Sequence, residues 1–401
     1  MKNKKRLLIL GAGRGQLGLY KAARELGITT IAGTMPHYHK PCIDLSDEVC
    51  YMDISNPDEV LEKAKKLNLD GAETCCLDTG ISSRGKVCDN LNLIGLTEYS
   101  AKMCNDKSIM KKAFLENNVN TAKYFEISSK EELEKALEII QLPVIIKATD
   151  LQGSNGIYIA KSKSEAISGF IQAMEKTKRD YCIVEEYIEG WEFGAQSFVY
   201  NGEILFVMAH GDETYMSHTA VPVGHYVPLD VDNQISEKID KEVKKAIRAL
   251  KLDNCAVNVD MILRDGEVYL IELTGRVGAN CLPELVEINF GVEYYKMIAT
   301  MAVGENPLIY WEKRINKNKA GLARMIIEER NSGVINEIKN KNESYDYIRE
   351  ITFFKSKGDE INKFENSTDC IGQVIVEGNS LENCEDNMDK VISNIKIDIK
   401  C

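Results

Sequence analysis

The stretch VYLIELTGRVGAN, residues 268–280, decides the fold that we expect for this 401-residue chain. Its alternation of apolar and polar residues predicts a strand with one face in a protein core. In such a strand Glu272, Thr274 and Arg276 share one face, while Leu273 points into the core. An acid, a hydroxyl and an arginine on one face make this strand a candidate for binding a charged ligand.

The preceding stretch CAVNVDMIL, residues 255–263, predicts the antiparallel partner strand and carries Asp260. A two-residue turn would pair Asp260 with Ile271, on the wrong face. A three-residue turn, Arg264–Gly266, puts Asp260 on the face of Glu272, and we expect this turn because its glycine can adopt a left-handed conformation. Two such carboxylates repel unless a cation neutralises them, and oxygen ligands favour Mg²⁺ or Mn²⁺. A solvated sheet face is the alternative, and the pattern favours neither.

Two stretches upstream have the composition of a nucleotide site. In KATDLQGSNG, residues 147–156, a lysine ends an apolar strand and small residues follow it. The exposed N–H groups of such a loop can surround phosphate oxygens, although a polar turn with an exposed lysine is the simpler interpretation. In IVEEYIEGWEFGAQSF, residues 183–198, acids lie within an apolar strand, as a slot for a base requires.

The N-terminal stretch RLLILGAGRGQLG, residues 6–18, predicts a strand, a glycine turn and a helix. Its Gly13, Gly15 and Gly18 fit the dinucleotide-binding pattern, but no carboxylate follows the next strand before Asp44. We therefore expect the first unit of a parallel sheet without a dinucleotide. From about residue 105 hairpin patterns replace this alternation, and the tail from about residue 311 predicts a small α+β domain.

Composition limits the partners and the compartment. A chain with 44% hydrophobic residues can bury several cores, and a net charge of −12 argues against nucleic acid or an anionic membrane as a partner. The apolar run after the basic N-terminus is too short for a signal peptide, and we expect no membrane span. Twelve cysteines without paired C-x-x-C spacing indicate reduced thiols in the cytoplasm.

Taken in order, the pair DK at 106–107, PVIIKATDLQGSNG at 143–156, VEEYIEGWE at 184–192 and ELTGR at 272–276 resemble the ATP-grasp superfamily of carboxylate ligases. The resemblance implies an α/β and α+β multidomain chain: an N-terminal parallel-sheet domain (1–104), an ATP-grasp domain (105–310) with a mobile lid (about 115–188), and a C-terminal α+β domain (311–401). The last domain is similar to those of amino-acid ligases and biotin-carboxylase-like ligases.

The resemblance also implies roles for single residues, with ATP and Mg²⁺ (or Mn²⁺) bound. The family's usual asparagine is replaced by Thr274, which puts its metal ligation in question. The implied phosphate ligands are Lys107, Lys147, Gly153, Ser154, Asn155 and Gly156; the base and ribose contacts are Glu185, Glu186, Ile188 and Glu192; the metal ligands are Asp260, Glu272 and Thr274; and Arg276 acts with Lys147 in catalysis.

The implied reaction joins a small-molecule carboxylate, activated as an acyl phosphate, to an amine such as an amino acid. Candidate substrate contacts are Asp78, Arg84, His218 and His225, each of which has a packed or surface role as its alternative. Three other functions stay open: a nucleotide-binding regulatory protein without turnover, a carboxylase-like enzyme acting on bicarbonate, and an oxidoreductase. A homodimer is compatible with all of them.

Overall fold

The structure is a computed structural model that describes residues 4–36, 41–151, 155–216, 220–315 and 319–400. The chain forms two compact units, which are described separately. The first unit consists of Met1–Val207, Val231–Val277 and Ile298–Pro307, and the second of Met208–Asp230, Gly278–Met297 and Leu308–Cys401. The sequence boundaries expected at residues 104 and 310 remain predictions.

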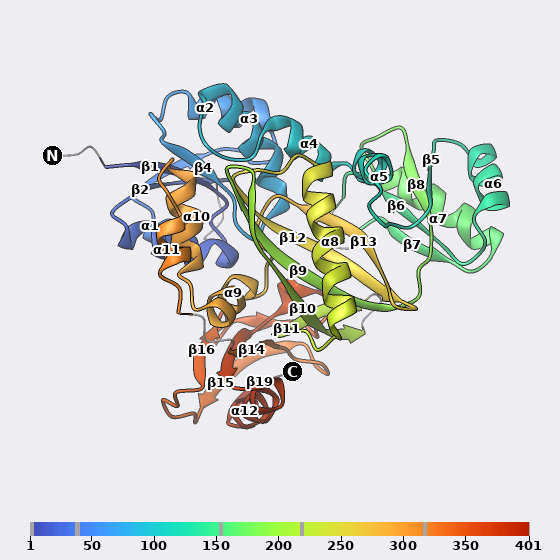
Figure 1. Ribbon diagram of the computed structural model, residues 1–401. Helices are drawn as coiled ribbons and strands as arrows, with labels where there is room; N and C mark the ends of the chain where they lie inside the picture. The colour runs from blue at the N-terminus through green and yellow to red at the C-terminus, as the bar shows by residue number, and fades with distance from the viewer. Residues whose placement is uncertain (1–3, 37–40, 152–154, 217–219, 316–318, 401) are drawn as a thin grey trace. The chain divides into compact units, whose positions relative to one another are not determined.

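The first unit begins with the expected parallel sheet, in the order β3-β2-β1-β4 (Figure 1). Leu8 and Leu10 of β1 pack with Ile31 of β2 and with Val60 and Val87 of the surrounding helices. The elements are β1 (Arg6–Leu10), α1 (Leu17–Glu25), β2 (Thr29–Thr34), β3 (Glu48–Tyr51), α2 (Pro57–Ala64), β4 (Gly71–Glu73), the short helix η3 (Asp78–Gly80) and α3 (Ile81–Leu91).

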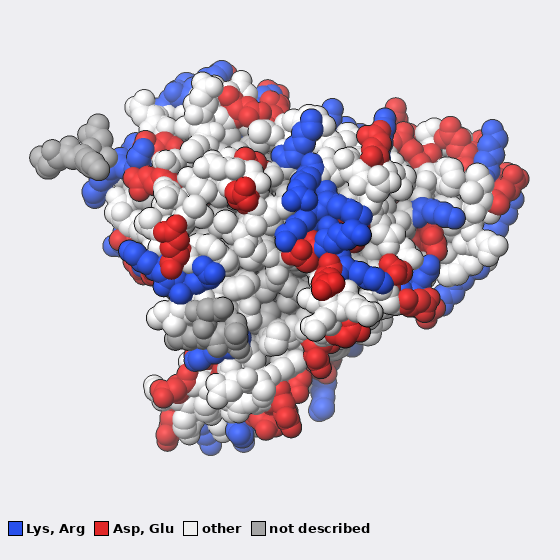
Figure 2. Space-filling model, viewed as in Figure 1, with Lys and Arg blue, Asp and Glu red and all other residues white. Residues whose placement is uncertain are grey.

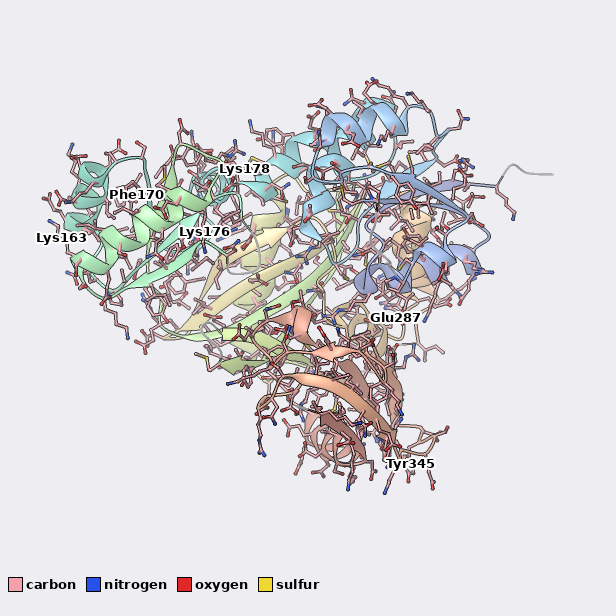
Figure 3. All side chains as sticks on the ribbon, turned by 180° about the vertical axis from the view of Figure 1, so that it is seen from behind. Lys163, Phe170, Lys176, Lys178, Glu287 and Tyr345 are labelled. Carbon is pink, nitrogen blue, oxygen red and sulfur yellow. The ribbon has the colours of Figure 1, made fainter. Side chains whose placement is uncertain are left out.

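Helices α4 (Glu98–Asn105) and α5 (Lys107–Glu116) lead into the segment predicted as a lid. This segment folds as a four-stranded antiparallel sheet, β5-β8-β6-β7, that packs against two helices. Figure 3 shows the second helix running from Lys163 to Lys176, with Lys178 following it. The mobility of the segment stays a prediction. Its elements are β5 (Tyr124–Ile127), α6 (Lys130–Ile139), β6 (Val144–Ala148), β7 (Ile157–Ala160), α7 (Lys163–Lys176) and β8 (Cys182–Glu186).

The remainder of the first unit contains the two strands on which the sequence argument rests. The strand β12 (Cys255–Arg264) lies between β9 (Trp191–Tyr200) and β13 (Glu267–Thr274) and is antiparallel to both. Helix α8 (Asn233–Ala249) contacts β13, and Lys and Arg side chains gather over this helix on the face seen in Figure 2. Strand β10 (Glu203–Met216) starts here and continues into the second unit.

The turn between β12 and β13 differs from the prediction. Arg264 pairs with Glu267, so the turn has two residues, Asp265 and Gly266. Both have a left-handed backbone conformation. A bulge between Asp260 and Met261 then shifts the register, so that Asp260 still lies opposite Glu272. The three-residue turn was therefore wrong, although the face that it was meant to explain was right.

The second unit is an α+β structure, as expected for the tail. The end of β10 pairs with β11, and the sheet continues in the order β11-β14-β18-β16. A second sheet has the order β17-β15-β19. Apolar residues of α12 pack with apolar residues of both sheets. Among the described residues no helix has the length and apolar character needed to cross a membrane. The elements are β11 (Ala220–Val227), α9 (Leu282–Phe290), α11 (Leu308–Glu312), β14 (Ala320–Ile326), β15 (Gly333–Asn340), β16 (Ile348–Phe353), β17 (Glu360–Ile361), β18 (Gly372–Gly378), α12 (Leu381–Ser393) and β19 (Ile395–Lys400), with α10 (Tyr294–Ala302) at the boundary of the units.

Candidate active site

A buried carboxylate lies between two lysines in the first unit. Glu185 of β8 is 2% exposed, and its Oε2 is 3.3 Å from Nζ of Lys147 and 3.1 Å from Nζ of Lys111. Lys147 lies on β6, the neighbour of β8, and Lys111 lies on α5, where its Nζ also donates to Oγ1 of Thr121 at 2.6 Å. The second carboxylate oxygen, Oε1, is buried without a hydrogen-bond partner among the described residues.

The charges of this cluster depend on one another. Burial alone would raise the pKa of Glu185, but Lys111 and Lys147 together lower it below its usual value. Burial lowers the pKa of Lys111, and the attraction of Glu185 only partly opposes this effect. An ionised carboxylate with one unpaired, buried oxygen can accept a hydrogen bond from an amino group, such as that of adenine.

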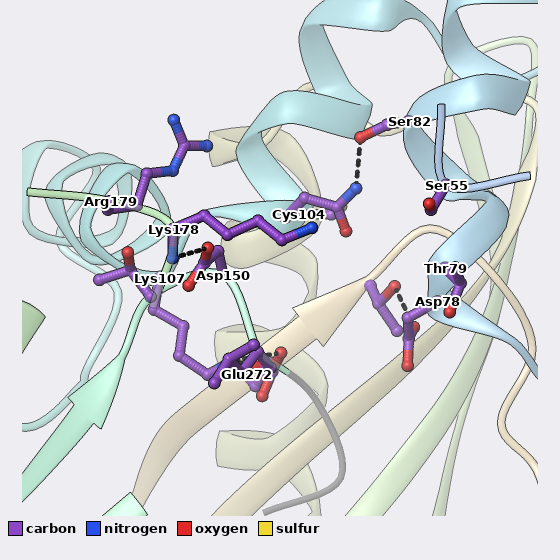
Figure 4. A pocket seen from close by; sticks show the side chains of 14 residues that line it. Ser55, Asp78, Thr79, Ser82, Cys104, Lys107, Asp150, Lys178, Arg179 and Glu272 are labelled. Atoms are coloured by element: carbon purple, nitrogen blue, oxygen red, sulfur yellow. Dashed lines mark hydrogen bonds and ion pairs between the residues drawn. The ribbon is translucent and has the colours of Figure 1, made fainter. Parts of the chain in front are cut away.

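A second lysine–acid pair, Lys107 and Glu272, lies at the start of α5. Lys107, the first residue of the helix, donates through Nζ to the carbonyl of Leu151 at 2.9 Å and to Oε1 of Glu272 at 3.2 Å (Figure 4). The Asp106 side chain caps the helix by accepting from the N–H groups of Ser108 and Ile109. Burial opposes the charge of Lys107, but Glu272 outweighs this effect and raises the pKa of the lysine. The cap therefore fixes Lys107 against the strand that carries Glu272.

The acids expected to hold metal lie on neighbouring strands. Asp260 of β12 is in register with Glu272 of β13, and the Asn258 side chain donates to Oδ1 of Asp260 at 3.2 Å. Cross-strand partners on one face have their Cβ atoms within about 5.5 Å. Oxygen donors alone at this position suit a hard cation such as Mg²⁺.

Arg276 is held by Asp78, the first residue of the short helix η3. Its Nε donates to Oδ1 of Asp78 at 2.6 Å and its Nη2 to Oδ2 at 2.5 Å, a two-point pair. Thr274 also donates to Oδ1 of Asp78, at 3.1 Å. Burial would raise the pKa of Asp78, but Arg276 lowers it overall, and the same pair raises the pKa of Arg276. The hydroxyl of Thr274 is thus engaged with Asp78.

Asp78, Lys107, Glu272 and Thr274 line one pocket of about 450 Å³ in the first unit (Figure 4). Its wall combines acids, lysines and hydroxyls from η3 and α3, from α4 and α5, from the predicted lid and from β13. The lining residues include Ser55, Asp78, Thr79, Ser82, Asn105, Lys107, Asp150, Lys178, Arg179, Glu272 and Thr274.

Other predicted site residues lie as follows. Ile188 is buried, Glu186 accepts from Arg264 at 3.3 Å, and Glu192 lies exposed on β9. Gly156 has a left-handed conformation at φ 71°, and Asn155 accepts from the Lys176 side chain at 3.1 Å. Gly153, Ser154 and His218 lie outside the described residues. His225 belongs to the second unit, with Asp212 as its partner.

Arg84 was expected at the substrate, but it does not line the pocket. Its side chain has no exposed surface and donates to the carbonyls of Gly275 at 3.0 Å and Asn254 at 3.2 Å. Its Nη2 lies 2.8 Å from Oε2 of Glu73, in an ion contact that is not aligned as a hydrogen bond. Gly275 separates Thr274 from Arg276, so Arg84 holds the end of β13 in place.

Lys111 was missed by the sequence reasoning. It follows Lys107 by four residues, and residues with this spacing lie on one face of a helix. This spacing could have identified it, since a second lysine on the helix face of Lys107, which is predicted to bind phosphate, is a simple pattern. Lys178 and Arg179 at the pocket have no comparable signal, because they lie in a connecting loop.

Comparisons with known proteins show the family of the chain. Residues 140–284 match the ATP-grasp domain family, and residues 327–400 match the family described as L-amino acid ligase C-terminal domain 2. The chain is 67% identical to phosphoribosylglycinamide synthetase from Anaerococcus prevotii. Its match to the crystal structure of that protein covers 99% of this chain and 100% of that chain, with a TM-score of 0.89. The L-amino acid ligase from Bacillus licheniformis, 17% identical with a TM-score of 0.83 over the full length of both chains, has the same fold.

The chain therefore belongs to the ATP-grasp ligases. The alanine–anticapsin ligase from Bacillus subtilis is 26% identical over 242 residues, which are 54% of this chain and 51% of that protein. The chain thus spans about half the length of this relative. The names of these relatives point to different substrates, so the similarity does not identify the substrate.

Proposed function

We propose that the protein is an ADP-forming carboxylate–amine ligase. ATP would transfer its γ-phosphoryl group to a substrate carboxylate, and an amine would attack the resulting acyl phosphate and release phosphate. The observation that carries this proposal is the pocket, because it combines the acid of a metal pair, a phosphate-type lysine and an arginine-bound acid in one wall.

Nucleotide binding would use the buried cluster and the start of α5. The unpaired Oε1 of Glu185 fits the amino group of adenine, while Lys147 and Lys107 would neutralise phosphate oxygens. Glu186, Ile188 and Glu192 would contact the base and ribose, and the turn with Asn155 and Gly156 would cover the phosphates. Lys111 would stay with Glu185 and keep it ionised.

Metal binding would involve Asp260 and Glu272, with the Lys107 amine leaving Glu272 when a cation takes its place. Mg²⁺ would supply the neutralisation of phosphate charge that lets two anions approach each other. Thr274 would act through Asp78, because its hydroxyl already donates to that carboxylate. Thr274 would therefore position Asp78, where the family's usual asparagine would bind the metal.

Arg276 and Asp78 would orient the transferred group. A planar guanidinium can hold a phosphate or a carboxylate by two hydrogen bonds, and the pair with Asp78 keeps it ionised at the pocket wall. The predicted lid would exclude water, which would otherwise hydrolyse the acyl phosphate. These steps require no covalent nucleophile of the protein.

The test is release of ADP and phosphate on mixing the full chain with ATP, Mg²⁺ and amino acids, singly and in pairs, with the product detected by mass spectrometry. We expect at least one pair to give stoichiometric ADP, phosphate and a conjugate with an amide mass. The variant Arg276→Gln is the matched control and should bind ATP without turnover. Tight ATP binding without ADP formation for any carboxylate would instead support the regulatory function.

A further inference from the structure

Three potential metal ligands face one another on the β10–β11 hairpin of the second unit. Asp212 of β10 is directly opposite His225 of β11, and His210 precedes Asp212 by two residues and so shares its face. Nδ1 of His210 is 3.1 Å and Nδ1 of His225 is 2.6 Å from the same oxygen, Oδ1 of Asp212. The antiparallel ladder therefore gathers two imidazoles and a carboxylate at one point.

The surroundings of this cluster favour the ligand forms of its members. His210 is 2% and His225 5% exposed, and their rings meet edge to face with centroids 5.2 Å apart. Burial lowers the pKa of His210, so the ring is neutral near pH 7 and keeps a lone pair. Burial would raise the pKa of Asp212, but the two histidines hold it well below its usual range. The cluster thus presents an imidazole nitrogen from each histidine beside an anionic oxygen of Asp212.

We infer that His210, Asp212 and His225 form a binding site for a divalent transition-metal ion, with zinc as the first candidate. One ligand atom from each residue lies within 4.8 Å of the other two, close enough to share one ion. Nitrogen donors disfavour Mg²⁺ and Ca²⁺, whereas two histidines with one carboxylate suit Zn²⁺, Fe²⁺ or Co²⁺ and leave a position open.

The hairpin needs little change to take such an ion. Zinc bonds of about 2.0–2.2 Å in tetrahedral geometry hold neighbouring ligand atoms roughly 3.3 Å apart. The contact between His210 and Asp212 is already near this value, and that between His225 and Asp212 must widen by about 0.7 Å. The ion would take the place of the two Nδ1 protons, and each ring would carry its proton on Nε2 instead. No bond of the backbone ladder has to break.

The test measures metal directly and needs neither ATP nor turnover, so it is independent of the proposed ligase reaction. The full chain is stripped with a chelator, titrated with Zn²⁺ or Co²⁺, and its metal content is measured after gel filtration. We expect about one ion per chain, and a visible Co²⁺ spectrum of nitrogen and oxygen ligands without a near-ultraviolet thiolate band. That band separates this site from the chain's cysteines, which also bind these ions.

Two variants and one control identify the residues. His225→Gln and Asp212→Asn keep polar side chains in the hairpin and should each weaken binding at least about tenfold. The control Glu213→Gln removes a neighbouring charge that pairs with Arg324 and should leave the ion bound. A wild-type chain that takes up no ion, or that binds equally after both substitutions, would overturn the proposal.

Discussion

At the scale of single residues, the two lysines beside Glu185 let the fold tolerate the loss of either one. Because both lysines share Oε2 of Glu185, the loss of one leaves the buried carboxylate paired with the other. We therefore expect Lys147→Ala to fold and to bind ATP at least about tenfold more weakly, with ADP formation nearly abolished. Calorimetric ATP titration and a melting curve measure both effects. The exposed Lys161→Ala is the control, and unchanged ADP formation in Lys147→Ala would remove Lys147 from the site.

Glu284 of α9 makes stability depend on pH. Burial raises its pKa to about 7; Tyr295 donates to its Oε1 at 2.8 Å, and its Oε2 has no hydrogen-bond partner among the described residues. The folded state then binds the proton more tightly than the unfolded state, so stability falls as pH rises from about 4.5 through 7. Glu284→Gln should remove this loss and stabilise the protein by about 1–3 kcal/mol near pH 8, but not near pH 5.

Denaturant unfolding at these two pH values measures the effect of Glu284→Gln. The exposed Glu385→Gln on α12 should change stability equally little at both values. Equal stability of Glu284→Gln and the parent protein near pH 8 would show that Glu284 does not carry a buried charge.

The placement of residues could be predicted where alternation along a strand fixes it, and less well where packing decides. Alternation puts Asp260 and Glu272 on one face, and the structure has them opposite each other, while their roles stay predictions. The placement of Arg84 could not be predicted, because its sequence position cannot distinguish a side chain that lines a pocket from one buried against carbonyls. The partnership of His210 with His225 depends on a hairpin whose register shifts at a bulge after Glu213.

At the scale of elements, α3 holds the end of β13 through a single side chain. Arg84→Met would remove the donors to Gly275 and Asn254 and leave Glu73 buried without its cation. We expect a loss of about 3 kcal/mol in stability and a lower kcat at an unchanged KM for ATP, because Arg276 would lose its fixed position. Chemical unfolding and steady-state kinetics test the two effects.

A second substitution separates stability from positioning. Burial raises the pKa of Glu73 to about 7, so the neutral Glu73→Gln in combination with Arg84→Met should restore part of the stability. It cannot restore the hydrogen bonds to the two carbonyls. If kcat recovers together with stability, Arg84 only supports the fold and does not position Arg276.

At the scale of the whole molecule, the two units should respond to different ligands. A ligand that binds only the folded state stabilises it by about 2.7 kcal/mol at a hundred times its Kd. We expect ADP with Mg²⁺ to raise the melting temperature of the first unit, and Zn²⁺ that of the second, in a scanning calorimeter with two transitions. A single transition that both ligands shift equally would mean that the units unfold together.

The arrangement of the molecule could be predicted from the sequence only in part. Parallel and antiparallel regions follow from the spacing of strands and helices, and the structure has both in the expected order. The two compact units do not follow, because each is assembled from segments that are far apart along the chain. Such grouping depends on contacts between distant residues, which no local pattern reports.

The bulge beside Asp260 has a consequence for recognising the proposed metal pair, Asp260 and Glu272, in other chains. Across a two-residue turn without a bulge, an even number of residues separates any two opposed positions, whereas eleven residues, Met261–Ile271, separate Asp260 from Glu272. An odd number of residues between two acids on neighbouring strands is therefore a criterion for finding such a pair. It applies whether a bulge or a three-residue turn shifts the register. Deletion of Ile271 would leave ten residues between the two acids, the even number that a two-residue turn without a bulge requires. Asp260 should then still lie opposite the second acid, and Mg²⁺-dependent ADP formation should persist. Loss of activity in a folded deletion variant would contradict the parity rule.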